Sequence, residues 1–304
     1  MKWKKQGLIF VAEGNFEWMV SHAMLPCVRC LGAGDFRVYF SSRDQLNRSR
    51  PASFDFNITN PAKIFNLSET PLLELGRRGA YDDSGVMPTC VVENNGVQYM
   101  FFNGWSLGTT VPFYSFNGIA RETGDGGFVK LAEYPNALNR SASDPYSTFA
   151  PFVLLDNGKW RMWYVSLVKW ENDKKHYYHI KYAESPDGLA WNPLDIVCMD
   201  FASPTEFALG RPMVVKDANL YRMWFCSRAL YGIDSYRIRY AESCDGIHWV
   251  RKDDQAGIDV SSQGWDCDMI CYPFVFDHEG QRFMLYNGND YGRTGVGLAV
   301  LECD

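Results

Sequence analysis

The segment Arg161-Met-Trp-Tyr-Val-Ser166 recurs 61 residues later as Arg222-Met-Trp-Phe-Cys-Ser227. Downstream of it, Ile180-Lys-Tyr-Ala-Glu-Ser-Pro-Asp-Gly-Leu-Ala-Trp191 recurs as Ile238-Arg-Tyr-Ala-Glu-Ser-Cys-Asp-Gly-Ile-His-Trp249. Self-similarity at a fixed step is the sequence signature of a repeat architecture. The order of elements within one copy therefore decides the fold.

Each copy begins with a proline that opens an apolar strand. These prolines are Pro26, Pro88, Pro151, Pro212 and Pro273, so the steps between copies are 62, 63, 61 and 61 residues. A turn rich in Gly, Asn and Asp follows each first strand and leads into a second, aromatic strand. The second strands are predicted over residues 36–40, 98–102, 160–164, 221–225 and 282–286.

A repeat of this length with short strands and no long helical pattern is typical of one propeller blade. The last copy offers only one further strand, over residues 295–301, and residues 5–11 can supply its missing outer strand. We therefore expect an all-β fold, a single five-bladed β-propeller domain over residues 1–304 whose N-terminal and C-terminal strands pair to close the ring. Residues 47–74 and 110–142 are the least regular and are expected to form longer loops.

Composition excludes several classes of protein. The chain has 304 residues, a formal net charge of −6 and no basic run, which argues against a nucleic-acid partner. No stretch approaches the roughly 20 apolar residues of a membrane span, and no signal peptide is recognisable, so a cytoplasmic location is expected. The nine cysteines lack metal-site spacing, so neither a metal nor a cofactor is predicted. The aromatic content of 15% suits both large β proteins and carbohydrate binders.

In a propeller, the residues before each first strand and those after each second strand converge on one mouth of the central channel. In this sequence these positions carry acids, arginines, aromatic rings and amides, which suits a ligand with many hydroxyl groups and an optional phosphate. Asp83, Glu206 and Asp268 are the candidates for acid/base chemistry, because crowded carboxylates raise one another's pKa. Asp82 competes with Asp83, since strand alternation lets only one of the two point into the channel. The alternative is that these acids cap turns or pair with Arg211.

The remaining candidates are predicted to bind substrate. Arg43, Arg211 and Arg228 suit a carboxylate or phosphate, or else balance a neighbouring acid such as Asp44. His22 suits a hydrogen-bond donor or a proton carrier, and a structural role is the alternative. Aromatic rings for stacking on a sugar and further polar contacts complete the substrate-binding set: Trp18, Asp44, Asp82, Trp105, Tyr146, Asn289 and Asp290.

The motif Ser-x-Asp-Gly-x-x-Trp occurs at Ser185–Trp191 and at Ser243–Trp249. It follows the third strand of its copy, where the chain must turn into the fourth. We predict a structural role, in which Asp and Gly form the turn and Trp packs between blades.

Five copies with these motifs resemble the five-bladed propeller glycosidases, which include glycoside hydrolase families 43, 32 and 68 and the family 130 mannoside phosphorylases. The resemblance implies glycoside chemistry in the central pocket. In the hydrolases an Asp precedes the first-blade proline, whereas Leu25 stands there in this chain, and the nearest substitutes are Glu17 and His22. Arg211 precedes Pro212, and Asp83 is the best match to the blade-two acid.

Three functions stay open on these grounds. The first is an enzyme that cleaves or transfers a glycosyl group by carboxylate acid/base chemistry on a sugar or oligosaccharide. The second is a glycoside phosphorylase or a glycosyltransferase that acts on a phosphorylated or nucleotide-linked sugar. The third is a non-catalytic carbohydrate-binding propeller. The missing acid before Pro26 favours the second and third over plain hydrolysis.

Overall fold

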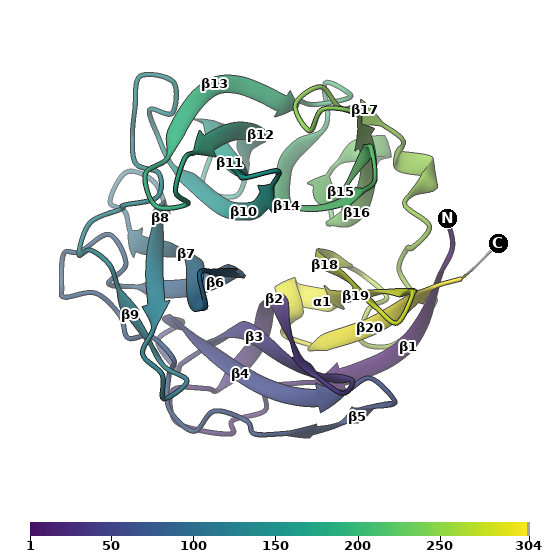
Figure 1. Cartoon of the computed structure of the whole chain (residues 1–304). Coiled ribbons are helices and arrows are strands. Elements are labelled where there is room, and N and C mark those ends of the chain that lie inside the picture. The colour runs from purple at the N-terminus through teal and green to yellow at the C-terminus, as the bar shows by residue number, and fades with distance from the viewer. Residues whose placement is uncertain (303–304) are drawn as a thin grey trace.

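The computed structural model describes residues 1–302, and strands dominate it, at 56% strand against 3% helix. The strands form sheets that surround a common centre, with β2, β6, β10, β14 and β18 innermost (Figure 1). Among residues 1–302, no helix has the length and apolar character that crossing a membrane requires.

Each sequence copy folds into consecutive antiparallel strands, and we call these groups unit 1 to unit 5. Unit 1 comprises β2 (Ser21–Gly32), β3 (Asp35–Arg43), β4 (Ser49–Asn57) and β5 (Asn60–Phe65). Unit 2 comprises β6 (Gly85–Asn94), β7 (Val97–Leu107), β8 (Phe113–Glu122) and β9 (Phe128–Lys130). Unit 3 comprises β10 (Thr148–Asp156), β11 (Lys159–Trp170), β12 (His176–Ser185) and β13 (Asn192–Met199).

Unit 4 comprises β14 (Phe207–Asp217), β15 (Leu220–Arg228), β16 (Arg237–Ser243) and β17 (Val250–Arg251). Unit 5 comprises β18 (Cys271–His278), β19 (Gln281–Asn287), β20 (Val296–Leu301) and the first strand of the chain, β1 (Trp3–Phe10). Three single-turn helices lie in the connections: η1 (Leu230–Gly232), η2 (Asp253–Gln255) and α1 (Asn289–Gly292).

The two ends of the chain meet in unit 5. β1 pairs antiparallel with β20, with Trp3 opposite Leu301 and Phe10 opposite Val296. Units 1 and 2 join into one sheet through a single parallel contact between Ser49 and Gly85. Units 3 and 4 are separate four-stranded sheets.

Two segments that we expected to be irregular contain strands. Residues 47–74 hold β4 and β5, and residues 110–142 hold β8 and β9. The alternation of apolar and polar residues that marks a half-exposed strand is absent in β4, because both of its faces are buried between neighbouring elements.

The second strands provide the core. The last aromatic residue of each predicted second strand is fully buried: Phe40, Phe102, Tyr164, Phe225 and Tyr286. The Ser-x-Asp-Gly-x-x-Trp turns pack between units, which confirms their structural role. The Asp187 carboxylate accepts the N–H groups of Leu189 and Ala190, and Trp191 packs edge-on against Phe101 of unit 2 at 5.8 Å.

Four of the five innermost strands kink just before their proline. Leu25, Ala150, Arg211 and Tyr272 adopt the left-handed conformation, with φ between +49° and +56°, and the pairing register shifts at each kink. This conformation costs a non-glycine residue roughly 1–2 kcal/mol. It also turns the backbone N–H of the kinked residue away from its own sheet.

A side chain of the preceding unit accepts the freed N–H group at three of these kinks. Asn287 Oδ1 accepts from Leu25 at 3.0 Å, Asn103 Oδ1 accepts from Ala150 at 2.7 Å, and Cys226 Sγ accepts from Tyr272 at 3.0 Å. Each acceptor directly follows the buried aromatic residue of its second strand. The side chain at this position of the repeat therefore bonds each of these units to the next one.

We expect Asn287→Ala to lower the free energy of unfolding by roughly 2–4 kcal/mol, because it leaves buried backbone groups without a hydrogen-bond partner. The Asn287 side chain also donates to the carbonyls of Ala23 at 2.6 Å and Gly295 at 2.9 Å. Asn103→Ala removes one inter-unit bond and should cost about 1–3 kcal/mol. Urea denaturation measures both changes. The exposed Asn60 provides the matched control, and equal stability of Asn287→Ala and Asn60→Ala would contradict the inter-unit role.

Candidate functional site

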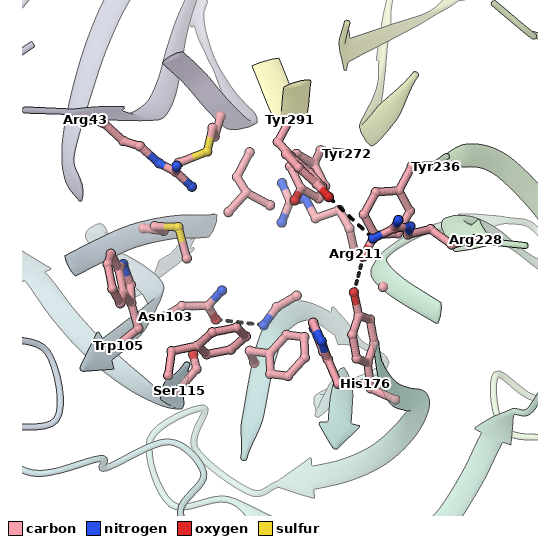
Figure 2. A pocket seen from close by; sticks show the side chains of 18 residues that line it. Arg43, Asn103, Trp105, Ser115, His176, Arg211, Arg228, Tyr236, Tyr272 and Tyr291 are labelled. Carbon is pink, nitrogen blue, oxygen red and sulfur yellow. Dashed lines mark hydrogen bonds between the residues drawn. The ribbon is translucent and has the colours of Figure 1, made fainter. Parts of the chain in front are cut away.

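A cavity of about 330 Å³ lies where the innermost strands converge (Figure 2). The residue before each of the five prolines lines it: Leu25, Met87, Ala150, Arg211 and Tyr272. Four of these are the kinked residues, so the kinks aim side chains from different units at one space. The expectation that residues before the prolines converge on one mouth agrees with this placement.

The ends of the second strands supply the next lining residues. Arg43 ends β3, Asn103 and Trp105 lie near the end of β7, and Arg228 ends β15. Trp105 is held in place because its Nε1 donates to Ser49 Oγ at 2.7 Å. Of the predicted site residues, Arg43, Trp105, Arg211 and Arg228 line the cavity.

The beginnings of the third strands also reach the cavity, and the sequence analysis missed them. β8 contributes Phe113 and Ser115, β12 contributes His176 and Tyr178, and Tyr236 directly precedes β16. A third strand starts where the second strand ends, so its first residues lie at the same mouth. The i, i+2 spacing of polar and aromatic residues at these strand starts was the available signal. Tyr291 on α1 completes this group.

The lining carries positive charge only. Its charged groups are three arginines, and no carboxylate of residues 1–302 belongs to it. Arg43 is largely buried, its Nε has no hydrogen-bond partner, and none of the described carboxylates forms an ion pair with it. Burial lowers the pKa of Arg43. A buried cation without a protein counter-charge is energetically costly, and an anionic ligand would relieve that cost.

Arg211 has a different role from Arg43. Its side chain is 1% exposed and donates to the carbonyl of Pro26 at 2.9 Å and to that of Thr89. Arg211 belongs to unit 4, whereas the two carbonyls belong to units 1 and 2. The guanidinium therefore ties three units together in the wall of the cavity, and it does not pair with the acids as the alternative interpretation proposed.

Arg228 lies among aromatic rings on the other side of the cavity. Its guanidinium pairs with the exposed Asp234 at 2.7 Å and donates to the Tyr291 hydroxyl at 3.5 Å. It also lies over the ring of Phe207 at 5.0 Å. The neighbouring phenols are neutral, because burial raises the pKa of Tyr178, Tyr236 and Tyr272. The hydroxyls of Tyr178 and Tyr236 are hydrogen-bonded to each other.

Two buried histidines are also neutral near pH 7. Burial lowers the pKa of His176 to about 4, and the charge of Arg228 acts in the same direction. Burial likewise lowers the pKa of His22 to about 4, reinforced by Arg43 and Arg293. His22 stands beside Arg43 and accepts or donates a hydrogen bond with Ser21 Oγ at 2.8 Å, but it does not line the cavity.

The three carboxylates predicted to be catalytic lie outside the cavity lining. Asp83 accepts from the Gly79 N–H and the Ser84 hydroxyl, both at 2.8 Å, as a turn cap does. Glu206 is buried and binds Arg251 through two hydrogen bonds of 2.7 and 2.8 Å. Asp268 is exposed. Its backbone N–H donates to Asn289 Oδ1 and its carbonyl accepts from Arg237, so the backbone of Asp268 holds the loop before β18.

Glu206 belongs to a recurring set of buried acids at the entrances to the units, which we call the entry acids. Each pairs with a basic residue on the third or outer strand of the unit that it precedes. The pairs are Asp82 with Lys130, Asp144 with Lys181, Glu206 with Arg251 and Asp266 with Lys5. The entry acids therefore fasten loops to sheets, which explains why the cavity is left without carboxylates.

The other residues predicted to bind substrate do not line the cavity. Trp18 donates to the Glu69 carbonyl and stacks on Phe16. Asp44 accepts from Arg48 and Arg50 within its own loop. Three more lie outside the lining: the exposed Tyr146, Asn289 at the start of α1, and the exposed Asp290.

Lowering the pH from 6.5 toward 4 should destabilise the protein. In this window the unfolded chain protonates His22 and His176, with an ordinary pKa of 6.5, while the folded chain does not. For each histidine, the free energy of unfolding therefore falls by up to about 1.4 kcal/mol for each pH unit in this window. Urea denaturation at several pH values should show a shallower loss for His22→Asn and His176→Asn. Asn60→Ala, which changes an exposed residue that does not titrate, should retain the wild-type slope, and unchanged slopes in His22→Asn and His176→Asn would contradict the burial of these imidazoles.

The fold is that of known glycoside hydrolases. A glycosyl hydrolase from Bacteroides ovatus matches with a TM-score of 0.76 at 12% identity, over 99% of this chain and 93% of that one. A thermostable family-43 glycoside hydrolase matches with a TM-score of 0.69 at 16% identity, over 95% and 93%. An endo-arabinase from Bacteroides thetaiotaomicron matches with a TM-score of 0.67 at 12% identity, over 98% and 99%. The resemblance to the propeller glycosidases is thereby confirmed for the fold.

No protein-family model matches the chain. Two proteins of Mycobacterium tuberculosis, the uncharacterized proteins Rv1502 of strain H37Rv and MT1551 of strain CDC 1551, are each 42% identical to it over 303 residues. The alignment covers 99% of this chain and 100% of each relative. At that identity and coverage, the chain belongs to the family of Rv1502 and MT1551.

Proposed function

We propose that this protein is a single five-bladed β-propeller that binds an anionic carbohydrate in its central cavity. The anion is a phosphate or carboxylate carried by the sugar. The observation that carries the proposal is Arg43, a largely buried cation in the cavity wall without a counter-charge from residues 1–302. The pairing of β1 with β20 and the order of the sheets support the closed propeller.

The charge of the lining argues for an anionic ligand. Arginine presents a planar set of donors that matches phosphate and carboxylate groups. The neutral phenols and imidazole around Arg228 provide further hydrogen-bonding groups without repelling an anion. A neutral ligand would leave Arg43 buried and unpaired, with the full desolvation cost.

The remaining lining residues suit a sugar. Asn103, Ser115 and the tyrosine hydroxyls are donors and acceptors for hydroxyl groups, and Trp105 offers an aromatic surface beside them. The shared fold with glycoside hydrolases supports a carbohydrate ligand by analogy.

Two-carboxylate hydrolysis is the less favoured reading of this cavity. Such hydrolysis needs two carboxyl groups that flank the scissile bond. The described lining contains none, and Glu206 is already bound to Arg251. The second candidate function is therefore glycosyl transfer to or from a phosphate, which the arginines of the cavity would hold.

Binding measurements with simple probes test the proposal. Glucose 1-phosphate and glucuronic acid should each raise the melting temperature and bind in calorimetry, whereas glucose should bind much more weakly. Arg43→Gln should weaken binding of the anionic probes by about tenfold or more, since a charge-assisted hydrogen bond is lost. Arg77→Gln, which removes an exposed arginine that does not line the cavity, should bind as the wild type does. Equal affinity for glucose and its phosphate would contradict the proposal.

Arg43→Gln should also leave the unliganded protein at least as stable as the wild type, because the substitution removes an unpaired buried charge. Glu206→Gln should instead lower the free energy of unfolding, because it weakens a buried pair with Arg251. Thermal unfolding of both variants provides the measurement. A loss of stability in Arg43→Gln as large as that in Glu206→Gln would indicate a structural role for Arg43.

A further inference from the structure

The cationic groups of the cavity fall into two sets that belong to different units. Arg43 comes from β3 of unit 1, and its charge acts on His22 together with that of Arg293. Arg228 comes from β15 of unit 4 and stands beside His176 of unit 3. Figure 2 shows Arg43 and Arg228 on opposite sides of the cavity, with Tyr272 and Tyr291 between them.

The space between the two sets holds one further cation, Arg211. Its two Nη groups donate to the carbonyls of Pro26 and Thr89, while its Nε has no hydrogen-bond partner. Tyr272 is neutral because burial raises its pKa, and burial also raises the pKa of Tyr291. The middle of the cavity therefore presents one arginine whose Nη groups are already bonded to the protein, together with neutral hydrogen-bonding and aromatic groups, while Arg43 and Arg228 lie at the two ends.

Both ends lack full compensation by protein carboxylates. Neither Arg43 nor Arg293 forms an ion pair with any carboxylate of the described chain. Arg228 has one acidic partner, Asp234, whose side chain is 74% exposed and therefore contributes a screened interaction. Each end can thus accept an anionic group of its own.

We infer that the natural ligand carries two anionic groups at opposite ends of one sugar, such as two phosphates or a phosphate and a carboxylate. This inference rests on the proposed function and specifies it further. One anionic group lies at Arg43, the other lies at Arg228, and the sugar ring occupies the space between them, near Asn103. A cavity of about 330 Å³ accommodates a ligand of this size, near the lower end of the range for small-molecule sites.

Calorimetry with glucose 1-phosphate, glucose 6-phosphate and glucose 1,6-bisphosphate at constant ionic strength tests the inference. The bisphosphate should bind at least about tenfold more tightly than either monophosphate, because it engages both arginines. Arg43→Gln and Arg228→Gln should each reduce the bisphosphate to the affinity of a monophosphate. Arg77→Gln should preserve the advantage of the bisphosphate, which separates the local effect from the loss of one formal charge.

The variants also separate this inference from the proposed function. If both substitutions weaken one monophosphate equally and the bisphosphate gains nothing, a single shared anion site exists, and the two-anion inference is overturned while anionic sugar binding stands. If none of the three phosphates binds, both fail. Arg43→Lys and Arg228→Lys keep the charge and should retain part of the affinity, and melting temperatures establish that every variant is folded.

Discussion

The left-handed kinks before the prolines are the constraint on which the rest of this structure depends. At Leu25, Ala150, Arg211 and Tyr272 the innermost strands leave regular pairing and turn one side chain toward the centre. The conformation is unfavourable for these residue types, and it frees backbone N–H groups that cannot stay unpaired in the interior. Asn287, Asn103 and Cys226 of the preceding units accept three of those groups. The same kinks therefore join neighbouring units and shape the cavity.

A second principle of the molecule is the separation of charge. The entry acids each find a basic partner within their own unit, so their carboxylates are used for fastening loops to sheets. The cavity retains the arginines, together with phenols and imidazoles that burial keeps neutral. The fold is shared with glycoside hydrolases, and the lining of the cavity contains no carboxylate of residues 1–302. Function in such folds follows from the site and not from the architecture.

The unpaired Arg43 and the neutral histidines occupy positions in which their burial does not favour folding. A buried cation and a buried imidazole each make the unliganded protein less stable than apolar side chains at the same positions would. The fully buried aromatic residues of the second strands and the fastening contacts between units offset this cost. A rigid scaffold of this kind holds the two sides of the cavity in fixed relation, which a ligand with two charged ends requires.

The sequence by itself determined the repeat, the order of strands within each copy and the structural role of the Ser-x-Asp-Gly-x-x-Trp turns, because all of these follow from local spacing. It also singled out Arg43, Arg211, Arg228 and Trp105, which occupy positions defined by the repeat. Only the tertiary structure decided which polar residues share the cavity. His176, Tyr178 and Tyr236 come from third strands, and Glu206 faces Arg251, 45 residues away in sequence. The partner of a buried charged residue depends on distances between strands that no local pattern encodes. The entry acids therefore hold loops to sheets, whereas Arg43 and Arg228 line the candidate site.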